Sequence, residues 1–162
     1  MTITALLRTH WPAVKAIYEA GLATGNASFQ TSAPSWEEWD KSHLAHSRLV
    51  TLDSDTVTGW AALTPVSSRC VYAGVAEVSV YIDPTRHGQG VGKALLQALI
   101  TESELNGLWT LQAGIFPENT ASIQLHEKCG FRQVGVREKI GQMNGIWRDT
   151  ILLERRSKTI AV

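Results

Sequence analysis

The segment Tyr81–Ile100, YIDPTRHGQGVGKALLQALI, contains three glycines within five residues. Residues 75–82, at its start, alternate in polarity and predict a strand. Residues 91–105, toward its end, carry apolar side chains at helical spacing and predict a helix. The glycines therefore lie in a strand-to-helix turn, where the absence of side chains lets another group approach the backbone closely.

The three glycines, Gly88, Gly90 and Gly92, fit an anion site. The first N–H groups of a helix have no partner within it and carry a partial positive charge. Glycine lets a phosphate approach such N–H groups without a Cβ in the way. The simpler alternative is a turn that only breaks the chain. Three neighbouring side chains add positive or donor groups: Arg86, His87 and Lys93.

The spacing excludes two common phosphate motifs. A nucleoside-triphosphate loop needs four residues between its glycine and Gly-Lys, followed by Ser or Thr. Here only three residues separate Gly88 from Gly92, and Ala94 follows Lys93. A dinucleotide fingerprint needs a glycine three residues after Gly90, where Lys93 stands.

Composition excludes other classes of protein. The chain has 162 residues, 44% of them hydrophobic, with 15 basic and 15 acidic residues. Such a length predicts one domain over residues 1–162, and the charge balance gives no field for nucleic acid or an anionic membrane. Two cysteines, Cys70 and Cys129, are too few for a disulfide framework, and the start MTITALLRTHW lacks a signal core. We expect a reduced, cytoplasmic protein.

The remaining pattern predicts an α/β (α+β) fold with a mixed sheet flanked by helices. Ser35 and Glu38 have the spacing of a helix capping box. No repeat or linker divides the chain. In order, we expect a strand at 3–7, helices at 11–23 and 35–46, strands at 49–52, 57–63 and 75–82, a helix at 91–105, a strand at 109–115, a helix from Asn119 to Gly130, and strands at 133–137 and 147–154.

The glycine segment resembles the coenzyme A loop of the GNAT acetyltransferase superfamily. The likeness extends over three segments, AEVSVYIDPTRHGQGVG at 76–92, ENTASIQLHEKCGF at 118–131 and GIWRD at 145–149. These segments are similar to the phosphinothricin acetyltransferase branch of the superfamily. TGNASFQT at 24–31 resembles the substrate loop of that branch. His87 departs from the usual Gln or Arg, which leaves open whether His87 or Arg86 meets the pyrophosphate.

The resemblance implies a sheet splayed at its fourth strand, with acetyl-CoA in the gap as co-substrate. It also implies a small amine acceptor and a homodimer. The histidines show no metal-ligand spacing, so we expect no metal. The residues that it assigns to acetyl-CoA are Val78, Val80, Tyr81, Ile82, Arg86, His87, Gly88, Gln89, Gly90, Val91, Gly92, Lys93, Asn119 and Ser122.

Acetyl transfer to an amine needs a base for the ammonium and a proton for the thiolate. By composition, Glu77 is a solvated strand-end carboxylate; the resemblance makes it the general base. A lone helical histidine such as His126 is usually a surface residue; the resemblance gives it the role of acid or proton shuttle. Asn119 caps its helix and, by resemblance, contacts the pantetheine arm.

The resemblance places two residues near the acceptor. Arg69 reads as a solvated loop charge, but a bidentate guanidinium is also what an amino-acid carboxylate needs. Phe29, in the resembling loop, lines the side-chain pocket together with Glu77. We therefore expect an N-acetyltransferase acting on a small amino acid or analogue of the phosphinothricin, methionine sulfoximine or methionine sulfone type. The alternatives are a protein N-terminal or lysine acetyltransferase and a non-catalytic acyl-CoA sensor.

Overall fold

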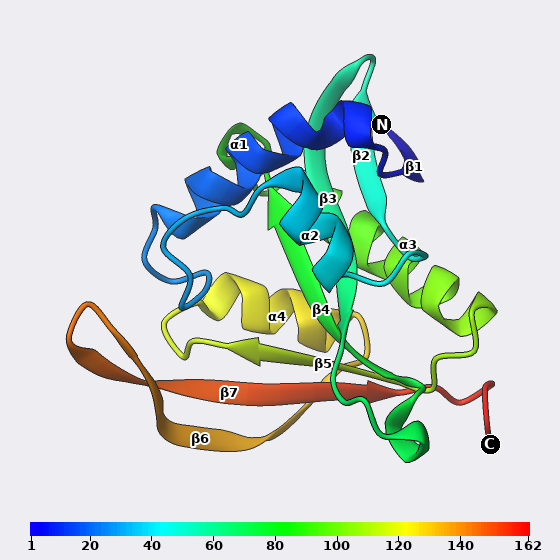
Figure 1. Cartoon of the computed structure of the whole chain (residues 1–162), viewed down its shortest axis with the longest axis vertical. Helices are drawn as coiled ribbons and strands as arrows, with labels where there is room; N and C mark the ends of the chain where they lie inside the picture. Colours follow the sequence, from blue (N-terminus) through cyan, green and yellow to red (C-terminus); the bar gives the residue numbers. More distant parts are fainter.

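The computed structural model describes residues 1–162 and is an open seven-stranded sheet with helices on both faces (Figure 1). In chain order the elements are β1 (Thr2–Ala5), η1 (Arg8–His10), α1 (Trp11–Leu22), α2 (Trp36–Ser42), β2 (Leu49–Asp53), β3 (Thr56–Pro65), η2 (Cys70–Tyr72), β4 (Val75–Ile82), η3 (Pro84–Arg86), α3 (Val91–Leu105), β5 (Thr110–Ile115), α4 (Thr120–Lys128), β6 (Arg132–Met143) and β7 (Ile146–Arg156).

The strands lie in the order β1-β2-β3-β4-β5-β7-β6. Neighbours are antiparallel except β4 and β5, which are parallel. The α3 helix provides the crossover that parallel neighbours require. The predicted mixed sheet is therefore confirmed. Its one parallel pair consists of β4, before the glycine segment, and β5, after α3.

The β3 strand shows why the sheet needs helices on both faces. All residues from Val57 to Leu63 are buried, as in a strand covered on both sides. Trp60 and Ala62 pack into a cluster with α1 and α2, whereas Ala61 and Leu63 pack into a second cluster with α3. Alternate side chains of one strand thus belong to two separate cores.

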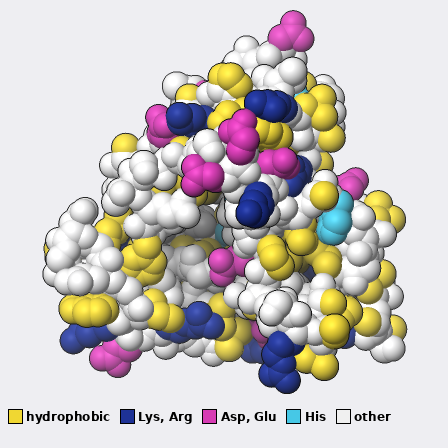
Figure 2. All heavy atoms as spheres, viewed as in Figure 1, with side chains coloured by type: hydrophobic (Ala, Val, Ile, Leu, Met, Phe, Trp, Pro, Cys, Tyr) yellow, Lys and Arg dark blue, Asp and Glu magenta, His cyan; other side chains and the backbone are white.

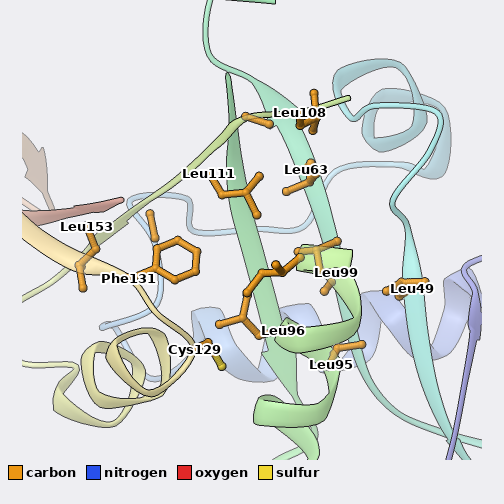
Figure 3. Packing of buried hydrophobic residues seen from close by; sticks show 14 of the residues in the cluster. Leu49, Leu63, Leu95, Leu96, Leu99, Leu108, Leu111, Cys129, Phe131 and Leu153 are labelled. Carbon is orange, nitrogen blue, oxygen red and sulfur yellow. The ribbon is translucent and has the colours of Figure 1, made fainter. Parts of the chain in front are cut away.

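The larger core lies between the sheet and the layer of α3 and α4 (Figure 3). Leu95, Leu96 and Leu99 of α3 are fully buried, and Leu111 of β5 and Phe131 pack with them. The α1–α2 core lies over β2, β3 and β4. Strands β5, β7 and β6 extend beyond it, so their face on that side is left without a helix (Figure 1).

Most predicted elements are present within two residues of their expected ends, but two differ. The helix expected to reach His46 ends at Ser42, because His43 is extended and stacks on Trp39 while the N–H of Leu44 donates to Leu63 of β3. The capping box of Ser35 is confirmed.

The C-terminal hairpin is longer than expected, because β6 continues past Arg137 through a bulge. Lys139 has φ 47°, and its N–H donates to the Asp149 carboxylate at 2.7 Å. Asn144 and Gly145, both at positive φ, make the two-residue turn. None of the helices combines the length and hydropathy needed to cross a lipid bilayer. No three His, Cys, Asp or Glu side chains are grouped as metal ligands.

Candidate active site

The sheet opens between β4 and β5. Their parallel pairing comprises Val75–Thr110, Ala76–Leu111 and Glu77–Gln112 only. Beyond this point β4 stays paired with β3 as far as Ile82, and β5 stays paired with β7 as far as Ile115. One edge of β4 from Val78 to Ile82 therefore has no strand beside it, which confirms the predicted splay at the fourth strand. A fully paired sheet would leave no such backbone free.

The glycine loop lies at the end of that open edge, and its glycines serve two purposes. Gly88 and Gly90 have φ of 76° and 79°, the left-handed conformation that favours glycine, and a Cβ on either would meet no atom. Gly92 has ordinary φ, but a Cβ there would lie 3.1 Å from Leu125 of α4. The first two shape the turn, and the third lets α3 and α4 pack closely.

The amides of this loop are unpaired, as the predicted anion site requires. The N–H groups of residues 87–93 donate to no group of the chain, and the first bond of α3 runs from Ala94 to Gly90. No side chain caps the helix. Such a cluster of free N–H groups at a helix N-terminus suits a phosphate.

Of the two candidate cations, one is already engaged. Arg86 donates to the Asp53 carboxylate at 2.6 Å and keeps the pKa of that carboxyl below its ordinary value. His87 is exposed and has no side-chain partner. A cavity of about 210 Å³ beside the loop is lined by Arg86, Gln89 and Val91 together with Met1, Asp53 and Thr58.

Glu77 occupies the last paired position before the strands diverge. Its side chain is half-buried and accepts a hydrogen bond from Gln112 Nε2 to its Oε1 at 3.3 Å. Its neighbour Val78 packs on the α3 core, so Glu77 projects to the opposite, α1–α2 side. The molecule is hollowed near its centre on the face shown in Figure 2. Gln112 had no role in the sequence interpretation. The available signal was its amide, between the buried apolar Leu111 and Ala113 of β5.

Tyr81 lies further along β4 on the same side as Glu77. Its ring stacks on Trp60 with centroids 5.0 Å apart and also contacts Tyr18 of α1. Burial raises the pKa of the Tyr81 hydroxyl, so it stays neutral at physiological pH. Because the ring is packed into the α1–α2 core, only the Tyr81 backbone faces the opening.

His126 is buried rather than on the surface. Its Nδ1 lies 2.7 Å from the Ser122 carbonyl, and its ring meets Phe131 edge-on at 5.0 Å. A carbonyl only accepts, so Nδ1 carries the hydrogen and Nε2, which has no partner, presents a lone pair. Burial lowers the His126 pKa by penalising the charged ring, so the residue is neutral at pH 7.

Asn119 makes more contacts than the predicted cap. Its Oδ1 accepts from the Ser122 N–H at 3.3 Å, as expected of a cap, and its Nδ2 donates to the Asn26 carbonyl at 3.2 Å. Asn26 belongs to the loop 23–35, between α1 and α2. The residue that starts α4 therefore also anchors this loop.

Arg148 is a second anchor that the sequence interpretation missed, although it stands within the GIWRD motif. From β7 its guanidinium donates to the Gly25 carbonyl, to Asn26 Oδ1 at 2.8 Å and to Glu118 at 3.1 Å. It also lies over the Phe116 ring at 3.8 Å. A cavity of about 200 Å³ beside it is lined by Gly25, Asn26, Met143, Asn144, Ile146 and Arg148. Glu77 lines neither this cavity nor the one beside the glycine loop.

The two predicted acceptor residues are not brought together. Arg69 is exposed, with its guanidinium over the Tyr72 ring at 5.6 Å. Its segment lies near the start of β5, because the Gly74 carbonyl accepts a hydrogen bond from the N–H of Trp109. Phe29 packs on Phe116, directly after the end of β5, with centroids 4.9 Å apart. The six residues of β5, about 20 Å in length, separate the two.

Comparison with known proteins agrees with this fold. The Acetyltransferase (GNAT) family matches residues 11–131. A phosphinothricin N-acetyltransferase of Alcaligenes faecalis is 39% identical over 152 residues, which is 89% of this chain and 76% of that one. An L-methionine sulfoximine/L-methionine sulfone acetyltransferase of Salmonella typhimurium is 33% identical over 111 residues, 68% of this chain and 65% of that one.

Solved structures show the same fold. A putative acetyltransferase from Salmonella typhimurium, solved with its cofactor acetyl-CoA, has a TM-score of 0.88 at 28% identity and covers 99% of this chain and 96% of its own. A ribosomal-protein-alanine N-acetyltransferase from Brucella melitensis has a TM-score of 0.89 at 28% identity, covering 97% and 100%. The chain belongs to the GNAT acetyltransferase family. It is an N-acetyltransferase with the splayed sheet typical of that family.

Proposed function

We propose that this enzyme transfers the acetyl group of acetyl-CoA to the amine of a small amino acid or analogue, of the phosphinothricin, methionine sulfoximine or methionine sulfone type. One observation carries the proposal: a half-buried carboxylate, Glu77, lies where β4 and β5 diverge. The open edge of β4 begins directly after it and leads to the free amides of the glycine loop. The names of the curated relatives support the substrate class.

The proposed acetyl-CoA site combines the two groups of backbone atoms that the fold leaves unpaired. The loop amides suit the diphosphate, and the open edge of β4 suits an amide-bearing arm such as pantetheine. His87 rather than Arg86 is free to approach the diphosphate, since Asp53 already holds Arg86. The full assigned set is Val78, Val80, Tyr81 and Ile82 by their backbone, residues 86–93 of the loop, and Asn119 and Ser122 of α4.

Acetyl-CoA supplies a thioester whose carbonyl carbon is open to a neutral amine. The chain supplies the proton transfers. Glu77 takes a proton from the substrate ammonium and so frees the nitrogen lone pair. His126, neutral with its Nε2 lone pair unused, suits a shuttle that accepts a proton and passes it to the thiolate, rather than an acid that already holds one.

The Glu77→Gln variant tests the assignment of the base. We expect kcat to fall about 100- to 10,000-fold with little change in acetyl-CoA binding, because only proton abstraction is lost. Glu127→Gln, on the exposed side of α4, removes a carboxylate elsewhere and serves as the control. Wild-type turnover in Glu77→Gln would show that the base is another group, and absence of any acetyl transfer by the wild type would favour an acyl-CoA sensor.

For the acceptor, we propose that Arg69 binds the substrate carboxylate. Phe29 packs on Phe116 at the far end of β5, about 20 Å away, so it cannot line the same small pocket. A charge-assisted bidentate pair is lost when the carboxylate is removed. Decarboxylated amines should therefore lose most of kcat/KM on the wild type and show no further relative loss on Arg69→Ala. Equal activity on an amino acid and its amine would exclude this pocket, and strong activity on peptides alone would favour the protein-acetyltransferase alternative.

We further propose that residues 1–162 act as one domain that forms a homodimer in the cytoplasm. The β6–β7 hairpin supports the dimer, because it carries exposed apolar side chains that a partner would cover: Val134, Val136, Ile140, Ile146 and Trp147. Cys70 and Cys129 are free thiols, which suits a reducing compartment. Light scattering tests the dimer, and a monomer at assay concentration would exclude it.

A further inference from the structure

A row of polar side chains crosses the sheet at the point where it opens. Directly paired residues of neighbouring strands project to the same face. The pairings Thr64–Glu77, Glu77–Gln112, Gln112–Glu154 and Glu154–Arg132 therefore place five polar residues side by side across β3, β4, β5, β7 and β6. Gln112 stands at the centre of this row and next to the proposed base.

Nothing in the packing of β5 requires an amide at position 112. Leu111 and Ala113, on either side, face the α3–α4 core, whereas Gln112 is half-buried on the opposite face. An apolar side chain would satisfy the strand equally well. The one side-chain hydrogen bond of Gln112 runs from its Nε2 to Glu77 Oε1, at 3.3 Å.

This hydrogen bond has only one possible direction. A carboxylate accepts and cannot donate, so the NH₂ group of the amide must face Glu77. The bond holds Oε1 of the carboxylate and restricts rotation of the carboxylate plane. Oε2 then remains as the oxygen available to the substrate.

The other groups around the row do not compete for this donor. Glu154, on the far side of Gln112, pairs with Arg132 at 2.5 Å. Thr64, on β3, does not titrate. Tyr81 on β4 and Tyr18 on α1, two titratable groups on the same side of the sheet, have pKa values raised by burial and stay neutral.

We propose that Gln112 is a positioning residue for the catalytic base. Its Nε2–H fixes Glu77 Oε1, and Oε2 takes the proton when the N–H bond of the substrate ammonium breaks and an O–H bond forms. Gln112 itself exchanges no proton. The inference rests on the proposed function, in which Glu77 is the base.

Gln112→Leu tests the hydrogen bond by removing the donor while keeping the size of the side chain. We expect kcat to fall about tenfold, the typical effect of losing one hydrogen bond to a charged group. The KM for acetyl-CoA should not change, because the amide does not face the glycine loop. An unchanged kcat in a folded variant would contradict the inference.

Gln112→Glu gives a readout that a purely structural residue would not move. Two carboxylates within hydrogen-bonding distance share a proton, so the acid limb of kcat/KM should move to higher pH by about one unit. Gln97→Glu, on the exposed face of α3, adds the same charge at a distance and should leave the limb in place.

The two proposals fail separately. If Glu77→Gln is inactive while Gln112→Leu has wild-type kcat and Gln112→Glu has the wild-type acid limb, Gln112 does not position the base. If Glu77→Gln retains turnover, the assignment of the base is wrong, and the role of Gln112 is overturned with it.

Discussion

Two loops flank the proposed site, and they are held in place in different ways. The glycine loop takes its shape from its own backbone, with Gly88 and Gly90 at positive φ and the Asp83 carboxylate accepting from the Thr85 N–H. The loop 23–35 has no regular structure and is anchored by Arg148 and Asn119, about 120 and 93 residues further along the chain. The conformation of a loop shaped locally can be predicted from sequence, whereas the contacts that hold a loop through distant side chains cannot.

Helix α4 connects the two loops. Its first residues carry the Asn119 contact to Asn26, and its Leu125 packs against Gly92 behind the glycine loop. His126 directly follows Leu125 on the same short helix.

Among substitutions in the two loops and α4, the largest effect is expected from Gly90→Val. A branched residue at positive φ costs about 1–2 kcal/mol, and the loop would relax by moving its amides away from a bound phosphate. We expect acetyl-CoA and CoA to bind about 100-fold more weakly, since each charge-assisted hydrogen bond contributes roughly 1.5–3 kcal/mol. Calorimetry with both ligands measures this loss.

Gly107→Val is the matched control for that experiment. Gly107 follows α3, has φ of 80°, and a Cβ there would meet no atom, so the substitution imposes the same strain away from the loop. It should lower thermal stability without changing CoA affinity. Equal loss of affinity in both variants would show that strain alone, and not loss of the anion site, weakens binding.

An intermediate effect is expected from Arg148→Met, which keeps much of the side-chain length but removes the donors. The KM for the acceptor should rise about tenfold while the KM for acetyl-CoA stays constant, because the loop 23–35 loses one of its two anchors and Arg148 contacts neither the glycine loop nor β4. Hydrogen exchange of residues 24–30 should accelerate. Arg148→Lys should not restore the wild type, since a single ammonium cannot replace a planar fork.

Arg8→Met controls for the loss of an arginine. Arg8 pairs with Glu37 in an exposed ion pair at 3.0 Å, of the kind that contributes little to stability. Arg8→Met should therefore leave the KM values for the acceptor and for acetyl-CoA unchanged. If Arg148→Met instead raises the KM values for both substrates equally, the anchoring of the acceptor loop is not separate from the rest of the site.

The smallest effect is expected from His126→Gln and concerns pH. Because burial lowers the pKa of His126 below its ordinary value, near pH 6.5 and lower the unfolded chain binds a proton that the folded chain does not. Stability should therefore fall as the pH drops from 8 to 5.5. The fall should be smaller in His126→Gln; His43, whose pKa is also lowered by burial, retains part of it.

Thermal unfolding of both proteins at pH 8 and pH 5.5 measures the difference. Activity assays on the same variant test the proposed shuttle, since glutamine keeps a polar side chain but cannot carry a proton. An identical acid sensitivity in wild type and variant would show that His126 takes up its proton in the folded state.

Much of the fold was open to prediction because its signals are local. The alternation of 75–82, the helical stripe of 91–105 and the Ser35 cap each depend on neighbours a few residues apart, and all three are confirmed. The glycine loop is also a local feature, because its shape depends on the positive φ of Gly88 and Gly90. The helix expected to reach His46 was wrong because a tertiary contact, Leu44 to Leu63, ends it.

The sequence by itself determined the strand–loop–helix unit and its free amides. Its resemblance to the GNAT superfamily also indicated Glu77 as the base. Only the tertiary structure decided which side chains surround that carboxylate and how the acceptor loop is held. Gln112 reaches Glu77 because two strands 35 residues apart lie in register, and Arg148 reaches Asn26 across 122 residues. Backbone conformation depends on short-range sterics, which a residue and its neighbours specify. Contacts between distant side chains depend on strand register and packing, which exist only once the whole sheet has formed.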